Sequence, residues 1–150
     1  MGLQYLHETA KIVHRDIKPQ NILLSESSLG YSTKLCDFGV SEKFETTDIM
    51  TKTAGTYHFF PPECCDPDIE EYSGKQADIW ALGVTLYCMI FNQLPFWDHD
   101  NFENEYTILE FILKNEVELP EGSRTDIGKD LIELMYQMLE KDPKSRITMD

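Results

Sequence analysis

One stretch decides how this 150-residue chain folds and what it can do: His14-Arg15-Asp16-Ile17-Lys18-Pro19-Gln20-Asn21. Within it, Asp16 precedes Asn21 by five positions, and Lys18 stands between the two. A carboxylate can orient a hydroxyl group and accept its proton, and an ammonium group can offset negative charge that develops during a reaction. An amide oxygen is a hard ligand of the kind that Mg²⁺ prefers. Three complementary groups therefore occur in one short loop.

A second motif, Asp37-Phe38-Gly39, stands sixteen residues beyond Asn21. It directly follows Thr33–Cys36, which together with Ile22–Leu24 forms two short runs of strand-forming residues around a turn rich in serine and glycine. These runs predict a small β-hairpin with Asp37 immediately after it. The carboxylate of Asp37 adds a second hard oxygen ligand, and nucleotide phosphates would complete the shell of a bound Mg²⁺.

The chemistry that these groups share is phosphoryl transfer, which depends on positioning and on neutralising charge on the phosphates. In that interpretation Asp16 orients the acceptor hydroxyl and takes its proton, while Lys18 offsets charge on the transferring phosphate. A simpler structural interpretation stays open, in which Asp16 and Asp37 are carboxylates that cap turns, as aspartate often does in loops.

The segment from residue 37 to residue 63 is irregular and rich in threonine, and Pro61-Pro62-Glu63 closes it. The loop at 14–21, the triplet at 37–39 and this closing motif occur together and in order, as in the protein-kinase signature. The whole chain resembles the C-terminal lobe of a eukaryotic Ser/Thr protein kinase. The resemblance implies a mainly α-helical fold with a small β-hairpin, and the N-terminal lobe is absent from this sequence.

The resemblance also assigns chemical roles to single residues, with ATP and Mg²⁺ as the cofactors. Three residues would be catalytic: Asp16 as the base, Lys18 on the transferring phosphate, and Thr56 bonded to both. The cofactors would be bound by Lys18, Asn21, Cys36 and Asp37, with Asn21 and Asp37 on the metal. Cys36 would line the floor of the nucleotide pocket, where its thiol could react with electrophilic inhibitors; the simpler interpretation is a small buried hydrophobic residue. Lys18 and Thr56 favour Ser/Thr over Tyr kinases, which usually carry Ala or Arg at the position of Lys18.

Further residues would support the site, as the resemblance implies: His14, Phe38, Gly39, Asp78, Glu63 and Arg146. His14 and Phe38 would stack in the regulatory spine, and Asp78 would bond the backbone of the catalytic loop from below. Glu63 and Arg146 would form a buried ion pair that ties the activation segment to the last helices. The alternative for Arg146 is a solvated charge at the surface.

The subfamily is indicated by three further runs, Tyr72–Trp80, Gly83–Tyr87 and Leu94–Phe96, which look most like those of calcium/calmodulin-dependent kinase kinases. Pro61 replaces the alanine that is normal at its position, a feature of the liver-kinase-B type. Both groups phosphorylate the activation loops of other kinases, so the resemblance implies protein substrates that include kinases. Calmodulin is an expected partner whose binding segment would lie downstream, outside this sequence.

Arg15 makes the loop an arginine-type catalytic loop, which in many kinases pairs with a phosphate on the activation segment. The candidate phosphate acceptors are Thr46, Thr47, Thr51 and Thr53. Thr51 and Thr53 lie nearest the usual position. Kinase kinases of the resembled group often need no such phosphate, so regulation through these threonines and activity without a phosphate both stay open.

Helical spacing of apolar residues predicts helices over residues 1–10, 76–91, 100–115 and 126–139, the second of them buried on nearly all sides. The expected apolar stripe of the third helix is Phe102, Tyr106, Leu109 and Leu113. The expected stripe of the fourth helix is Leu131, Leu134, Met135 and Met138. No repeat, linker or domain boundary is visible.

A complete kinase also needs a Gly-rich loop, a strand lysine and a helix glutamate, and none of them stands in this sequence. We therefore expect residues 1–150 to be a partial kinase domain, an incomplete copy of a kinase that transfers no phosphate by itself. The alternative is a non-catalytic interaction module, or a remnant that has lost its activity.

Composition excludes several other classes of function. The formal net charge is −14, which argues against binding to nucleic acids and against binding to an anionic membrane surface. With 41% hydrophobic and 11% aromatic residues, the chain can form a core. The longest charge-free apolar run, Ile79–Phe91, is shorter than the roughly 20 residues that span a bilayer, and no signal peptide is recognisable. These features predict a cytoplasmic protein.

The acidic surplus has two interpretations. It could favour basic substrate segments, or it could be an ordinary solvated surface, which is the simpler interpretation. Kinases that prefer basic substrates frequently carry Glu at the position of Gln20, so this residue removes one expected acidic contact. The four cysteines have neither the spacing of a zinc site nor that of a disulfide framework, and we expect reduced thiols.

Overall fold

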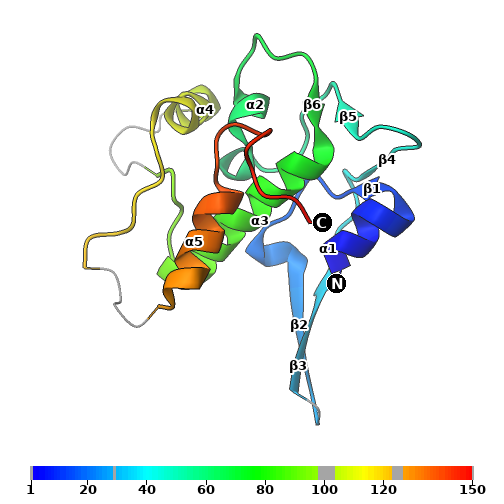
Figure 1. Cartoon of the computed structure of the whole chain (residues 1–150), viewed down its shortest axis with the longest axis vertical. Helices are drawn as coiled ribbons and strands as arrows, with labels where there is room; N and C mark the ends of the chain where they lie inside the picture. Colours follow the sequence, from blue (N-terminus) through cyan, green and yellow to red (C-terminus); the bar gives the residue numbers. More distant parts are fainter. Residues whose placement is uncertain (1, 29, 98–103, 123–126, 150) are drawn as a thin grey trace.

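The computed structural model describes residues 2–28, 30–97, 104–122 and 127–149. Figure 1 shows one long helix, α3 (Gly74–Phe91), crossing the middle of the molecule, with α5 (Lys129–Met138) packed beside it. Small antiparallel pairs of strands lie at the side and below. The predicted mainly helical fold with a small β-hairpin is confirmed to this extent.

The helix α3 is apolar on nearly all sides, as predicted, and begins two residues earlier than expected. Trp80 and Val84 in its middle are fully buried. The hydroxyl of Ser73 caps its N-terminus by accepting a hydrogen bond from the amide of Gln76 at 3.2 Å. Asn92 ends it in the left-handed region, at φ 55°. A helix that is buried along most of its length is a rigid anchor for any loop that its side chains contact.

The predicted hairpin is confirmed and is longer than the two runs suggested. Strand β2 (Ile22–Ser27) pairs antiparallel with β3 (Gly30–Leu35), in a register that sets Ile22 opposite Leu35. Figure 1 shows it projecting from the body of the molecule. Leu23 and Leu24 are 54% and 66% exposed, so the hairpin is held mainly by its ladder and not by burial.

The segment from residue 37 to residue 63 was expected to be irregular and instead contains short strands. β4 (Glu42–Lys43) pairs with β1 (Ile12–Val13), and β5 (Ile49–Met50) pairs with β6 (Tyr72–Ser73). A strand of two residues has no periodic pattern, so the sequence could not reveal it. The remaining short elements are α1 (Gly2–Gln4), the π-helical η1 (Tyr5–Ala10), and the turns η2 (Pro19–Asn21), η3 (Tyr57–Phe59) and α2 (Pro62–Cys65).

Helix α4 spans Glu105–Lys114, within the predicted 100–115, and the side chain of Asn104 caps it. The expected apolar stripe is wrong. Tyr106 is 82% exposed, whereas Ile108 and Ile112 are buried against the core. Leu109 and Leu113 are only partly buried, and Phe102 lies outside the described residues. Both stripes have helical spacing, and the packing of α4 on α2 and η3 selects the isoleucine side.

Helix α5 (Lys129–Met138) has half of its expected stripe inside the molecule. Met135 and Met138 are buried, but Leu131 and Leu134 are 39% and 37% exposed. The predicted start of this helix, Asp126, lies outside the described residues. The helix lies close to α3, because a Cβ added to Gly83 would come within 2.8 Å of the Cβ of Met138.

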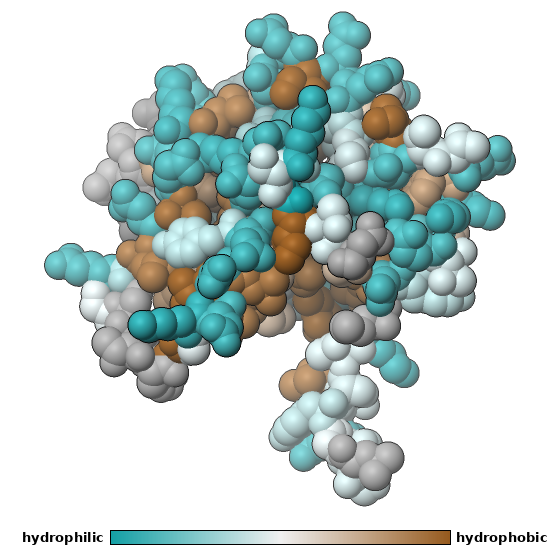
Figure 2. Space-filling view, viewed as in Figure 1, coloured by the Kyte–Doolittle hydropathy of each residue, from teal (hydrophilic) through white to brown (hydrophobic). Residues whose placement is uncertain are grey.

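Most buried side chains belong to one cluster around Trp80, and a smaller cluster joins Val13, Phe44, Met50 and Tyr72. Figure 2 shows hydrophilic residues over much of this face and hydrophobic residues gathered above the base of the hairpin. Among the described residues, no helix is both long and apolar enough to cross a membrane.

Candidate active site

The loop at 14–21 follows β1 and ends in the turn η2. Asp78 of α3 anchors the start of this loop. The two carboxylate oxygens of Asp78 accept hydrogen bonds from the backbone amides of His14 and Arg15, each at 2.8 Å. These bonds hold the loop where Arg15 adopts a left-handed backbone conformation, at φ 69°. Such a conformation is costly outside glycine, and surrounding contacts must impose it. The buried carboxylate of Asp78, 1% exposed, is one such contact.

A buried histidine that the sequence analysis gave no role also contacts Asp78. The Nε2 atom of His7 lies 2.8 Å from Oδ2 of Asp78, and both side chains are fully buried. The two residues are 71 positions apart, so no local pattern could have joined them. His7 thus links η1 to the anchor of the loop.

Asp16, Lys18 and Thr56 form a closed triangle of hydrogen bonds. The hydroxyl of Thr56 donates to Oδ1 of Asp16 at 2.7 Å and accepts from the ammonium group of Lys18 at 2.8 Å. The same ammonium group lies 2.8 Å from Oδ2 of Asp16. Thr56 lies 40 residues beyond Asp16, and the fold brings it back to the loop. Two sides of the triangle hold the carboxylate, and the third joins Lys18 to Thr56.

Asn21 braces the same carboxylate at Oδ2, the oxygen that Lys18 also contacts. Its amide nitrogen donates to the backbone oxygen of Asp16 at 2.8 Å and to Oδ2 of Asp16 at 3.0 Å. The NH₂ group is therefore turned toward Asp16, which leaves the amide oxygen of Asn21 to face elsewhere. That oxygen is the atom that a metal ligand needs.

The charge of Asp16 follows from these contacts. Burial opposes ionisation, but hydrogen bonds from Lys18 and Thr56, with a further one from Asn21, outweigh it and hold the pKa of the Asp16 carboxyl below its ordinary value. Asp16 is consequently a carboxylate at neutral pH. It can accept a hydrogen bond from an incoming hydroxyl group without first losing a proton of its own.

Two hydrogen bonds join the catalytic loop to Cys36, the residue before the triplet at 37–39. The amide of Cys36 donates to the backbone oxygen of Asn21 at 3.0 Å. The ring of His14 bonds the carbonyl of Cys36 at 3.0 Å, through Nε2. Cys36 is half-buried at this junction. The residue immediately before Asp37 is thus fastened to both ends of the loop.

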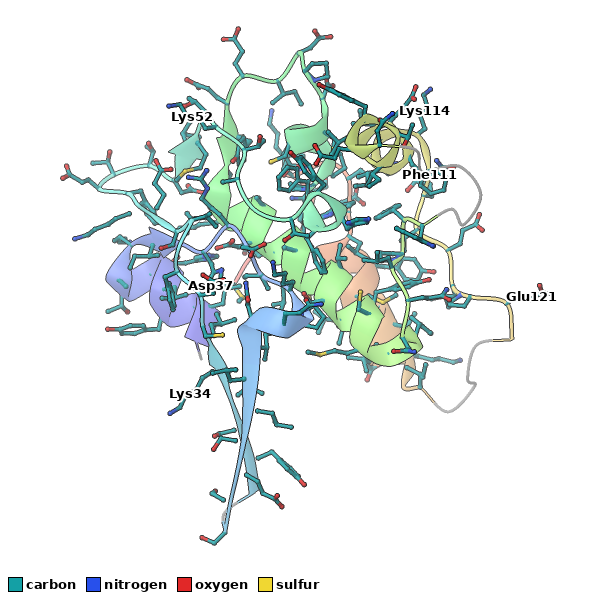
Figure 3. All side chains as sticks on the ribbon, turned by 180° about the vertical axis from the view of Figure 1, so that it is seen from behind. Lys34, Asp37, Lys52, Phe111, Lys114 and Glu121 are labelled. Atoms are coloured by element: carbon teal, nitrogen blue, oxygen red, sulfur yellow. The ribbon has the colours of Figure 1, made fainter. Side chains whose placement is uncertain are left out.

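Asp37 stands where β3 meets the body of the molecule, as Figure 3 shows. Its backbone is left-handed, at φ 62°, its side chain is exposed, and Oδ1 accepts a hydrogen bond from the amide of Gly39 at 3.3 Å. The described residues contain no group of three or more His, Cys, Asp or Glu that could hold a metal ion. Asn21 and Asp37 fit Mg²⁺ because this ion commonly takes one or two protein oxygens and completes its shell with phosphate and water.

The ring of Phe38 lies against that of His14, with centroids 5.0 Å apart and the planes tilted by 55°. Phe38 is nevertheless 45% exposed. The structure therefore brings together the two rings that were expected to stack, and one face of the pair stays open.

Arg15 contacts the activation segment through two groups that the sequence analysis did not connect. Its guanidinium group pairs with the carboxylate of Glu42 on β4 and donates to the backbone oxygen of Lys52 at 2.8 Å. Thr51 and Thr53 flank Lys52 and are both exposed. Glu42 was missed because a lone glutamate on a two-residue strand has no signal in the sequence.

Glu63 and Arg146 form the expected ion pair. The guanidinium group contacts both carboxylate oxygens, at 2.7 and 2.9 Å, and both side chains are buried. The alternative of a solvated Arg146 is therefore wrong, because Arg146 is 2% exposed.

The family model of the protein kinase domain matches residues 1–150. The chain belongs to the protein kinase family. Similar proteins include the calcium/calmodulin-dependent protein kinase kinase cmkC of Emericella nidulans, 44% identical over 152 residues. That similarity covers 100% of this chain and 27% of cmkC.

Two further relatives are serine/threonine-protein kinases. Ssp1 of Schizosaccharomyces pombe is 40% identical over 158 residues, covering 99% of this chain and 23% of ssp1. GRIK2 of Arabidopsis thaliana is 41% identical over 149 residues, covering 99% of this chain and 34% of GRIK2. This kinase chain therefore spans no more than about a third of the length of these three relatives. Within the family it groups with Ser/Thr protein kinases, as the resemblance implied.

Proposed function

We propose that this chain is the catalytic-loop part of a Ser/Thr protein kinase that transfers the γ-phosphate of Mg·ATP to Ser and Thr hydroxyls of proteins. The hydrogen-bonded triangle of Asp16, Lys18 and Thr56 carries the proposal. A carboxylate that merely capped a turn would need none of the three braces that hold Asp16. An inactive remnant would have no reason to keep them.

Each residue of the triangle has a step to perform. Asp16 receives the hydrogen bond of the acceptor hydroxyl, aligns its oxygen with the phosphate and takes the proton as the oxygen loses it. Lys18 offsets negative charge on the transferring phosphate. Thr56 joins the two side chains, so that neither rotates away during the reaction. The positions are fixed before substrate arrives, which is the form of catalysis that phosphoryl transfer uses.

Asn21 and Asp37 would hold Mg²⁺ on the nucleotide side of this triangle. When bound, the metal neutralises charge on the phosphates. The amide oxygen of Asn21 and the carboxylate of Asp37 are the ligands offered by the chain, and the contacts through Cys36 keep their two segments together. Cys36 would then lie beside the nucleotide, as expected for a residue in the floor of that pocket.

We further propose that residues 1–150 form the C-terminal-lobe part of a longer kinase. The sequence contains no Gly-rich phosphate loop and no lysine strand of the kind that covers the nucleotide. The relatives are at least about three times as long as the region that matches. Both facts favour an N-terminal lobe encoded elsewhere in the full-length protein.

The name of cmkC says that it phosphorylates protein kinases and depends on calcium and calmodulin. At 44% identity this makes other kinases the proposed substrates of this enzyme too. Calmodulin becomes a proposed regulator, bound through a segment outside these residues. A kinase assay with catalytically dead protein kinases as substrates, with and without calcium and calmodulin, tests both points.

The experiment on the proposed activity uses the full-length kinase with Mg·ATP and a mixture of Ser, Thr and Tyr peptides. We expect label on Ser or Thr, loss of transfer when Mg²⁺ is chelated, and loss in Asp37→Ala. Asp66→Ala is the matched control, because Asp66, like Asp37, accepts a hydrogen bond from the backbone amide two residues on, and Asp66 stands outside both motifs in the sequence. Transfer that Asp37→Ala leaves intact would refute the proposed metal-binding role.

A further inference from the structure

The guanidinium group of Arg15 is a largely buried cation that belongs to the catalytic loop. The side chain is only 10% exposed, and its Nε atom is buried without a hydrogen-bond partner among the described residues. Taking a cation out of water is costly unless an anion lies beside it. In the part of the chain that the structure describes, the carboxylate that pairs with this cation is that of Glu42.

The fold itself brings this carboxylate to the catalytic loop. Strand β4 lies beside β1 in a register that sets Glu42 opposite Val13, two residues before Arg15 (Figure 1). The amide of Phe44 donates to the backbone oxygen of Lys11 at 2.9 Å, and the ring of Phe44 is buried. A slip of one residue would turn the side chain of Glu42 to the other face of the strand, and the burial of Phe44 opposes it. The anion is therefore built into the chain and needs no modification.

The same guanidinium group holds the activation segment. It donates to the backbone oxygen of Lys52 at 2.8 Å, and the hydroxyl of Tyr72 donates to the same oxygen at 2.9 Å. Three residues further on, Gly55 packs so closely on the catalytic loop that an added Cβ would lie 2.2 Å from the backbone oxygen of Arg15. The residue after Gly55 carries the hydroxyl of the catalytic triangle. A contact that keeps Arg15 in place therefore helps to keep the triangle closed.

The surroundings of Arg15 leave little room for a phosphate. Arg15 and Thr53 line a cavity of about 20 Å³, which is enough for one water molecule. A phosphate on Thr51 or Thr53 would bring three acceptor oxygens and a charge of about −1.5 to −2. It would have to displace Glu42 from the guanidinium group or lie beside a second negative charge.

We propose, on the basis of the proposed kinase function, that Glu42 is a positioning residue whose carboxylate holds Arg15 and the activation segment in the active arrangement without a phosphate. A phosphate on Thr51 or Thr53 then adds no activity, because Glu42 already occupies the guanidinium group. Without the carboxylate, the buried cation lacks its anion, turns toward solvent and releases the backbone oxygen of Lys52. In that case a phosphate on the same segment supplies the missing anion and raises activity.

The first test measures kcat of the full-length kinase after phosphatase treatment, with mass spectrometry to show that Thr51 and Thr53 are unmodified. We expect the wild-type enzyme to transfer phosphate in this form. Glu42→Gln should lower kcat by about tenfold or more, because a hydrogen bond between charged groups is lost. The side chain of Glu42 is 52% exposed, so this variant should fold. Glu42→Asp keeps the charge and should recover part of the loss, and Glu45→Gln removes a charge from an exposed position three residues on and should keep wild-type kcat.

The second test installs phosphothreonine at position 51 or at position 53 of the full-length kinase. We expect no gain in kcat in the wild-type enzyme at either position. In Glu42→Gln, phosphothreonine at one of the two positions should raise kcat toward the wild-type value. A residue that only stabilised the fold would not make the response to phosphate depend on its charge.

The outcomes separate this inference from the function on which it rests. The inference fails alone if the wild-type kinase is active only when phosphorylated, if Glu42→Gln is as fast as Glu45→Gln, or if phosphate at neither position raises kcat of Glu42→Gln. If the wild-type kinase transfers no phosphate in either form, or if transfer survives Asp16→Asn, the proposed kinase function fails and the inference fails with it.

Discussion

Arg146 and Glu63 form a bidentate ion pair between residues 83 positions apart in the sequence. The guanidinium group also donates to the backbone oxygens of Gln76 and Glu140, at 2.9 and 2.8 Å, and lies 5.0 Å from the ring of Trp80. Its hydrogen-bonding groups are thus used within the core. This pair connects the end of the activation segment to α3 and to the last turn of the described chain.

Arg146→Leu removes the cation and leaves the Glu63 carboxylate buried without a partner. We expect the free energy of unfolding to fall by about 3–5 kcal/mol, because the stranded charge keeps its desolvation cost. Denaturant unfolding of the full-length kinase, followed by tryptophan fluorescence, measures the change. Lys114→Met breaks the exposed pair with Glu110 and serves as the control.

The control should cost no more than about 0.5 kcal/mol, as exposed pairs one helical turn apart do. A loss in Arg146→Leu that is no larger than the loss in Lys114→Met would mean that the buried pair contributes nothing special to stability.

Gly55→Ala tests the contact between the activation segment and the catalytic loop. Gly55 has φ +116°, and an added Cβ would lie 2.2 Å from the backbone oxygen of Arg15 and 3.4 Å from Oδ1 of Asp16. The segment must shift, and a displacement of about 1 Å at the site can lower kcat on the order of 100-fold. Steady-state kinetics of the full-length kinase measure the effect.

Gly30→Ala is the matched control for backbone strain. Gly30 has a similar φ of +109°, but an added Cβ meets no heavy atom within 4 Å among the described residues beyond its chain neighbours. We expect a loss of about 1–2 kcal/mol of stability from the left-handed conformation and no change in kcat. If both variants kept wild-type kcat, the packing of Gly55 on Arg15 would be irrelevant to the site.

Thr56→Val keeps the shape of the side chain and removes the hydroxyl that joins Lys18 to Asp16. Hydrogen bonds to charged groups contribute about 1.5–3 kcal/mol, so kcat should fall by roughly 10-fold to 100-fold. The KM for ATP should change less than kcat, because Thr56 contacts Asp16 and Lys18 but shows no hydrogen bond to Asn21 or Asp37, the proposed metal ligands, within the described residues. Thr56→Ser retains the hydroxyl and should recover most of the activity; a serine variant as slow as the valine variant would contradict the role.

The acid side of the pH profile reports the charge on Asp16. Since the pKa of Asp16 lies below its ordinary value of 3.8, Asp16 stays ionised as the pH falls from neutral to about 5, and its contribution is lost only below its lowered pKa. We expect kcat/KM of the wild-type kinase to show no loss from Asp16 over that range. In Thr56→Val one stabilising hydrogen bond is absent, so the acid limb should move to higher pH. Superimposable profiles would show that this bond does not act on Asp16.

The sequence predicted the elements whose signals are local. Helix α3 contains the charge-free, mainly apolar run Ile79–Phe91, and the strands of the hairpin flank a serine-rich turn, so both are recognisable without a structure. The side of α4 that faces the core was predicted wrongly, since Tyr106 and Ile108 both belong to stripes with helical spacing. Only the neighbouring elements α2 and η3 decide between them.

The residues of the candidate site also divide into those that local sequence spacing predicts and those whose contacts depend on tertiary packing. Asp16, Lys18 and Asn21 share one loop, so their spacing alone predicts a common site. His7 and Glu42 lie far from their partners in the chain, and neither stands in a pattern that assigns it a contact. Their pairs with Asp78 and Arg15 depend on how α3 and β4 pack, which only tertiary structure reveals.

The proposed activity depends on Asp16 as the carboxylate that receives the substrate hydroxyl, and Asp16→Asn in the full-length kinase removes that carboxylate. An amide of the same shape cannot accept the proton. We expect kcat for transfer from Mg·ATP to a Ser or Thr peptide to fall on the order of 100-fold to 10,000-fold, with the fold intact by circular dichroism and unchanged activity in the exposed control Asp130→Asn. A folded Asp16→Asn enzyme that retained wild-type kcat would show that Asp16 does not receive the substrate hydroxyl.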